Sequence, residues 1–299
     1  MIDDWAKIDS HTLDFRVPAF NESINNPLQA AIEAVNDIVE NYPSPYNLIV
    51  SGGIDSQAMI YAWKMSKKPF NIRSFRYNET YNWHDIKTLV DFCNIHDLTY
   101  DIIDVDYFKF LHEDYDAIAK RYKCSSPQIS MHIKMASYFK EQTCIYSGNF
   151  LQAVAAELTY AMMGIYRFSK TEEGKNTIPY FFLHTPELAY SFQKLDRFPD
   201  HPDAYQHKST YDIRLNKYHL GGFPVIPQER KYTGFEKFKE HYDSHDHVLK
   251  DIKNRLKYYM KPSHRPFDWI FRYPYEEIFG DPTLTYILNP PQENYHETY

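Results

Sequence analysis

The residues best suited to chemistry form one six-residue loop, Ser51-Gly52-Gly53-Ile54-Asp55-Ser56. Its two glycines allow a tight turn whose backbone amides can face an anion. Its two serines add hydroxyl donors. A helix that follows such a loop directs the positive end of its dipole to the same point. The loop therefore predicts a site that binds phosphate.

Asp55 makes this loop different from a simple phosphate site, because a carboxylate repels an anion unless a cation lies between them. Mg²⁺ is a hard cation that prefers carboxylate and phosphate oxygens, so we predict magnesium polyphosphate as the ligand and Asp55 as the metal ligand. The loop lacks the Gly-Lys-Ser/Thr ending of a P-loop and the Gly-x-Gly-x-x-Gly pattern of a dinucleotide site.

The elements that must position the loop alternate between strand and helix over residues 28–150. Apolar runs and helical spacing give their bounds. We expect strands at 47–50, 71–77, 99–105 and 144–146, and helices at 28–42, 55–67, 83–96, 107–122 and 127–141. This order predicts right-handed crossovers and a doubly wound, mostly parallel α/β sheet with helices on both faces.

The chain divides into three parts on the same evidence. Residues 1–27 are polar and interrupted by prolines, which predicts an irregular arm. Residues 28–150 form the expected nucleotide-binding α/β core. Residues 151–299 are rich in Pro, Tyr and His, and we expect a helical and irregular elaboration that completes the site. Its expected helices cover 151–166 and 236–259.

Composition narrows the class of protein. The 299 residues carry a net charge of −7, which argues against a generic nucleic-acid binder, although a local basic patch stays open. The three cysteines match no metal or redox spacing, and an odd number argues against a disulfide framework and for a reducing cytoplasm. The sequence has neither a signal-peptide pattern at its start nor a run of about 20 apolar residues, so we expect no membrane span.

The loop after its apolar strand resembles the signature of the PP-loop ATP pyrophosphatases, which include asparagine, β-lactam, NAD and GMP synthetases and tRNA-modifying ligases. The resemblance implies the fold of the adenine nucleotide α-hydrolases, with ATP and Mg²⁺ as cofactors. It also implies adenylation: a substrate oxygen attacks the α-phosphorus, pyrophosphate leaves, and a nucleophile, often an amine, displaces AMP.

Three further segments resemble the asparagine-synthetase-like branch. A second pyrophosphate-contacting loop would be Ser147-Gly148-Asn149. Residues 179–188 are similar to a Pro-Phe-Leu-Asp segment before a helix. Residues 230–235 resemble an Arg-x-Lys-x-Gly-Phe element, which implies that Lys231, with Arg230, binds pyrophosphate and stabilises the transition state.

The chain also departs from that branch. The second loop has no acidic residue before Glu157, which removes the usual second magnesium ligand. Lys231 lies three residues before Gly234, whereas the family lysine lies two before. No glutaminase domain precedes the loop, so a nitrogen donor would be ammonia, another amine or a partner's product.

We therefore expect an ATP-dependent adenylating ligase that activates a carboxylate or amide-like oxygen of a small molecule for attack by an amine. Arg76, on the strand at 71–77, is a further candidate for contacting the nucleotide, and a surface ion pair is its alternative. An ATP-dependent nucleobase-modifying enzyme and a degenerate nucleotide-binding scaffold are the two alternative functions. A homodimer stays open.

Overall fold

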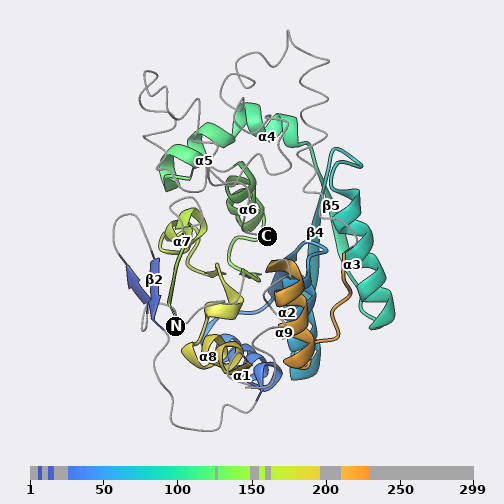
Figure 1. Cartoon of the computed structure of the whole chain (residues 1–299). Helices are drawn as coiled ribbons and strands as arrows, with labels where there is room; N and C mark the ends of the chain where they lie inside the picture. Colours follow the sequence, from blue (N-terminus) through green and yellow to red (C-terminus); the bar gives the residue numbers. More distant parts are fainter. Residues whose placement is uncertain are drawn as a thin grey trace, which may run out of the picture.

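A computed structural model of the chain describes residues 6–8, 13–16, 26–124, 127–148, 155–158, 163–195 and 210–228 (Figure 1). A five-stranded sheet forms its centre, in the order β5-β4-β3-β6-β8. Every neighbouring pair in this sheet is parallel. The strands are β3 (Tyr46–Val50), β4 (Asn71–Tyr77), β5 (Asp101–Val105), β6 (Thr143–Tyr146) and β8 (Thr177–Ile178). The predicted parallel α/β fold is therefore confirmed.

One face of the sheet carries the main apolar core. The helices that contribute to it are α1 (Pro27–Asn41), α2 (Ile54–Ser66), α3 (Trp83–Ile95), α8 (Pro186–Lys194) and α9 (Thr210–Leu220). Alternation along β3 points Leu48 and Val50 into this cluster, where Trp63 of α2 and Phe92 of α3 are fully buried. Figure 1 shows α1 and α8 side by side at the bottom of the molecule.

Four helices lie on the opposite face of the sheet: α4 (Tyr107–Glu113), α5 (Tyr115–Tyr122), α6 (Pro127–Ser137) and α7 (Met163–Ser169). Aromatic rings join them to the strands. Tyr77 of β4 packs against Tyr107 with ring centroids 5.1 Å apart, and Tyr146 of β6 stacks on His132 of α6 at 5.4 Å. Helices therefore cover both faces, as a doubly wound sheet requires.

A second, antiparallel sheet has the order β1-β2-β7, with β1 (Ala6–Ile8), β2 (Leu13–Arg16) and β7 (Ala155–Leu158). The expectation of an irregular arm is wrong for β1 and β2. The expectation of a helix over 151–166 is wrong for β7. Its sequence Ala-Ala-Glu-Leu favours a helix, but pairing with β2 overrides that local propensity.

Smaller differences concern the expected helices and one strand. The helix expected over 107–122 is interrupted at Asp114, whose carboxylate accepts a hydrogen bond from Lys134 of α6 at 2.9 Å. Strand β8, only two residues long, has too little periodicity to be predicted. The helix expected at 236–259 lies outside the described residues. None of the described helices is long and apolar enough to cross a membrane.

Candidate nucleotide site

The loop at residues 51–56 lies where the order of the sheet reverses. From β3 the chain moves outward to β4 and β5, and it then returns to the other side of β3 with β6 and β8. Ligands of such folds bind at this switch point, beyond the carboxyl ends of the strands. A cavity of about 220 Å³ lies here, and the loop, the ends of β3, β4 and β6, and one face of α6 line it.

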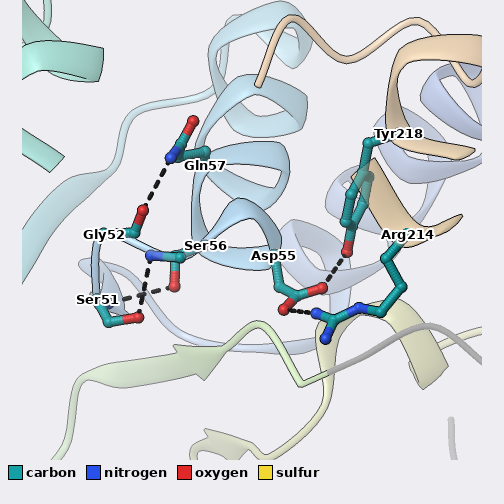
Figure 2. A network of polar contacts seen from close by, with 8 residues as sticks. Ser51, Gly52, Asp55, Ser56, Gln57, Arg214 and Tyr218 are labelled. Carbon is teal, nitrogen blue, oxygen red and sulfur yellow. Dashed lines mark hydrogen bonds and ion pairs between the residues drawn. The ribbon is translucent and has the colours of Figure 1, made fainter. Parts of the chain in front are cut away.

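Hydrogen bonds within the loop fix its conformation (Figure 2). The Ser51 N–H donates to Oγ of Ser56 at 3.2 Å, and the Gly53 N–H donates to Oγ of Ser51 at 3.3 Å. Both serine oxygens therefore accept bonds from backbone amides, which leaves each hydroxyl hydrogen able to donate to a ligand. Gly53 is the N-cap of α2, so the positive end of a 13-residue helix also points at this loop.

Gly52 allows the loop to approach α3 closely. A Cβ at this position would lie 1.9 Å from the carbonyl oxygen of Asp85, which is a backbone atom that cannot move aside. At Gly53 the nearest atom to a Cβ would be the Ser51 Oγ at 3.4 Å, an ordinary contact. The first glycine is therefore required by packing, whereas the second has room for a methyl group.

Asp55 faces two residues of α9 (Figure 2). Its Oδ2 forms an ion pair with Nη2 of Arg214, and its Oδ1 accepts a hydrogen bond from the Tyr218 hydroxyl at 2.6 Å. The carboxylate and the guanidinium are 18% and 17% exposed, respectively. Burial and the carboxylate raise the pKa of Tyr218 well above its ordinary value, so the phenol stays protonated and donates. Nothing in the sequence around Arg214 indicated this contact.

A magnesium ion on Asp55 does not fit this arrangement, because both carboxylate oxygens already have partners within the protein. Among the described residues, no group of three or more His, Cys, Asp or Glu side chains could hold a metal ion. The assignment of Mg²⁺ to Asp55 therefore stays a prediction, and the contacts of the carboxylate favour another role for it.

Gln57 ties the loop to the segment after α9. Its Nε2 donates to the Gly52 carbonyl at 2.8 Å and to the Ile226 carbonyl at 3.1 Å, and its Oε1 accepts from the Ile226 N–H at 2.6 Å. Nearby, Gln228 donates to Oδ1 of Asp85 at 3.0 Å. The segment at 221–228 thus joins the loop and the beginning of α3, a role that the sequence did not reveal.

The second expected loop follows β6 and also lines the cavity with Ser147 and Gly148. Gly148 adopts a positive φ of 60°, and a Cβ there would lie 3.1 Å from the Tyr180 ring. Both features favour glycine. Asn149 lies outside the described residues, so its contact with pyrophosphate stays a prediction.

Arg76, a further predicted residue, is not among the residues that line the cavity. Arg76 pairs with Asp104 across β4 and β5, with Nε–Oδ1 and Nη2–Oδ2 distances of 2.5 and 2.8 Å. This is the surface ion pair that was its alternative role, and it holds the pKa of Asp104 below its usual value. Lys231 and Arg230 lie outside the described residues, so their contact with pyrophosphate is untested.

A mostly aromatic wall, which we call the aromatic wall, lines the cavity together with the loop; composition suggested it only in general terms. It consists of His132 and Met135 of α6, Tyr146 of β6, and Tyr180. Burial lowers the pKa of His132 to about 4, so its imidazole is neutral at pH 7. On α6 the wall residues Gln128, Ile129, His132 and Met135 have helical spacing, a signal that could have located this face.

No protein-family model and no curated protein matches the sequence. Solved structures resemble the chain, and three of them, each with a TM-score of 0.35, are NAD or NMN synthetases. The NH3-dependent NAD synthetase from Campylobacter jejuni subsp. jejuni NCTC 11168 is 14% identical over 76% of this chain and 86% of that one. The NMN synthetase from Francisella tularensis is 14% identical over 74% and 93%. The glutamine-dependent NAD+ synthetase from Acinetobacter baumannii is 15% identical over 86% of this chain, but over only 50% of that one.

These similarities are too low to carry a conclusion about function. The sheet and its crossovers by themselves define a doubly wound α/β protein, with the loop at residues 51–56 at its switch point. The three structures are NAD and NMN synthetases. The closer resemblance to asparagine synthetases therefore stays a prediction.

Proposed function

We propose that this protein is an ATP-dependent adenylating ligase that cleaves ATP between the α and β phosphates. One observation carries the proposal: the Ser-Gly-Gly-Ile-Asp-Ser loop lies at the switch point of a parallel sheet and opens into a cavity. A phosphate chain there would meet the amino end of α2 and the hydroxyls of Ser51 and Ser56. Mg²⁺ would arrive on the phosphate oxygens of ATP and neutralise part of their charge.

In the proposed reaction, an oxygen of the acceptor attacks the α-phosphorus, and the bond to the bridging oxygen of the β-phosphate breaks. The loop holds the leaving pyrophosphate, whose charge grows in the transition state, by hydrogen bonds prepared in advance. An amine or ammonia then attacks the adenylate, loses a proton, and displaces AMP. The result is an amide-type carbon–nitrogen bond.

A decisive test follows the phosphorus label. The protein is incubated with ATP labelled at the α-phosphate, Mg²⁺, ammonium, and a panel of carboxylates and heterocyclic lactams. We expect AMP and pyrophosphate with at least one acceptor, and no ADP. Ser56→Ala should reduce turnover on the order of tenfold or more, since one preorganised donor is lost. Ser66→Ala is the matched control, because Ser66 lies at the other end of α2 and donates to the Trp63 carbonyl.

Release of ADP would contradict the proposal. Binding of ATP in calorimetry without turnover of any acceptor would favour a nucleotide-binding scaffold. Absence of binding, with Ser56→Ala indistinguishable from the wild type, would exclude both functions.

The aromatic wall favours a second candidate, an ATP-dependent enzyme that modifies a nucleobase or nucleotide. Rings of Tyr146 and Tyr180 and a neutral His132 line the cavity together with the loop, and such a wall suits a planar heterocycle. The heterocyclic lactams in the acceptor panel of the same assay separate the two candidate functions. Turnover of a pyrimidinone or purinone, but of no carboxylate, would establish the second one.

A further inference from the structure

The carboxylate of Asp55 raises a problem of charge at a loop built to bind an anion. It lines the cavity, it is largely buried, and it lies at the second position of α2, where the helix presents its amides. An uncompensated carboxylate at this point would repel a phosphate group. Some positive charge must therefore balance it when the loop binds polyphosphate.

The structure supplies this charge from α9. Arg214 and Tyr218 are four residues apart, so they lie on the same face of the helix. Arg214 forms the ion pair with Oδ2 of Asp55, while Tyr218 donates to Oδ1. Tyr218 is fully buried and packs against Phe182, Phe192 and Phe223, which fixes the position of its hydroxyl. The geometry thus holds the carboxylate on the α9 side of the loop.

A metal ion would have to displace these contacts. Mg²⁺ requires near-octahedral coordination by oxygens at short range. Moving Asp55 to such an ion would break its largely buried ion pair with Arg214 and its hydrogen bond from Tyr218, which is unfavourable. We infer that Arg214, and not a metal ion, balances the charge of Asp55, so that the loop binds a polyphosphate without a metal ligand at this position.

This inference rests on the proposed function in one respect, the assignment of residues 51–56 as the polyphosphate site. The test is a double-mutant cycle on Asp55 and Arg214. Calorimetry measures the affinity of each variant for inorganic pyrophosphate, in EDTA and in Mg²⁺. In EDTA, Asp55→Asn removes a negative charge beside the loop and should tighten binding on the order of tenfold. Arg214→Gln leaves an unbalanced carboxylate and should weaken binding by a similar factor. The double variant should return close to the wild-type affinity.

The opposite signs of the two single variants separate charge balance from a purely structural role. If the pair only held α9 in place, both single variants would weaken binding. Arg121→Gln is the matched control, because it removes an exposed arginine that pairs with Glu173 and does not line the cavity. Its pyrophosphate affinity should equal that of the wild type.

A second measurement decides the metal assignment without pyrophosphate. Binding of Mn²⁺ to the wild type and to Asp55→Asn is followed by electron paramagnetic resonance. We expect the two titrations to coincide. A loss of Mn²⁺ binding in Asp55→Asn, or a gain in pyrophosphate affinity from Mg²⁺ that the wild type shows and this variant lacks, would overturn the inference. A wild type that binds no pyrophosphate under either condition would instead contradict the proposed function, and the Mn²⁺ titration would still decide the role of Asp55.

Discussion

The side-chain amide of Gln57 pairs with the backbone of Ile226 through two hydrogen bonds, as a neighbouring strand would. Its Oε1 accepts from the Ile226 N–H at 2.6 Å and its Nε2 donates to the Ile226 carbonyl at 3.1 Å. The same Nε2 donates to Gly52 in the phosphate loop. A single buried glutamine therefore connects the loop to the segment that follows α9.

Gln57→Leu should destabilise the protein, because the carbonyl of Gly52 and both backbone groups of Ile226 would lose their partner. Loss of such buried bonds costs about 1–3 kcal/mol. Urea unfolding measures the free energy, and calorimetry should show weaker pyrophosphate binding. Gln29→Leu is the matched control: Gln29 bonds to Glu33 on the exposed surface of α1, and its replacement should change stability by less than about 0.5 kcal/mol. Equal losses of stability in the two variants would show that Gln57 does not support the loop as described.

The two loop glycines should respond differently to alanine. In Gly52→Ala the new methyl group would meet the backbone of Asp85, which should cost on the order of 3 kcal/mol and abolish nucleotide binding. In Gly53→Ala the nearest neighbour is a serine hydroxyl at 3.4 Å, so we expect a folded protein. Thermal unfolding and calorimetry on the pair check this. A Gly52→Ala protein with wild-type stability would show that the loop does not pack on α3 as described.

Stability should fall as the pH is lowered from about 6.5 to 4. Burial lowers the pKa of His132 to about 4 in the folded state, whereas the unfolded imidazole titrates near 6.5. Between these values the unfolded chain binds more protons, so acid favours unfolding and the contribution is complete above pH 6.5. His132→Gln should flatten the unfolding free energy against pH. Some slope should remain, since burial also lowers the pKa values of His96 and His184. An unchanged slope would contradict an imidazole that stays neutral in the folded protein down to about pH 4.

All three thiols should resist modification in the native protein. Cys93, Cys124 and Cys144 are buried, and burial raises the pKa values of Cys93 and Cys144 to about 11 and 12. Thiolate is the reactive form, so a thiol-specific chromogenic reagent should react with none of them at pH 8 until urea unfolds the chain. Rapid labelling of one cysteine in the native protein would show that its helix or strand opens readily.

Local sequence patterns predicted the elements between residues 27 and 146 well. The helix α1 begins at Pro27 behind the N-cap Asn26, whose side chain accepts from the Gln29 N–H. The strands β3 and β4 agree with their expected bounds to within one residue. Strong apolar periodicity and proline or glycine boundaries explain this success.

The contacts that complete the candidate site had no such local signal. Asp55 and Arg214 are 159 residues apart, and Gln57 and Ile226 are 169 apart. A lone arginine on a polar helix is usually exposed, so only the folded chain reveals that this one is paired with the loop. The sequence therefore indicated a candidate anion-binding loop, but not the residues that pair with it and support it.

The contact of segment 221–228 with the loop also has a consequence for synthesis of the chain. The loop leaves the ribosome early, but the residue that supports Gln57 is made 169 residues later. At ordinary elongation rates this is a delay of roughly 10–30 s. During that time the sheet can begin to assemble while Asp55 and Gln57 still lack their partners. The nascent protein should therefore become competent to bind a nucleotide only after Ile226 has left the ribosome.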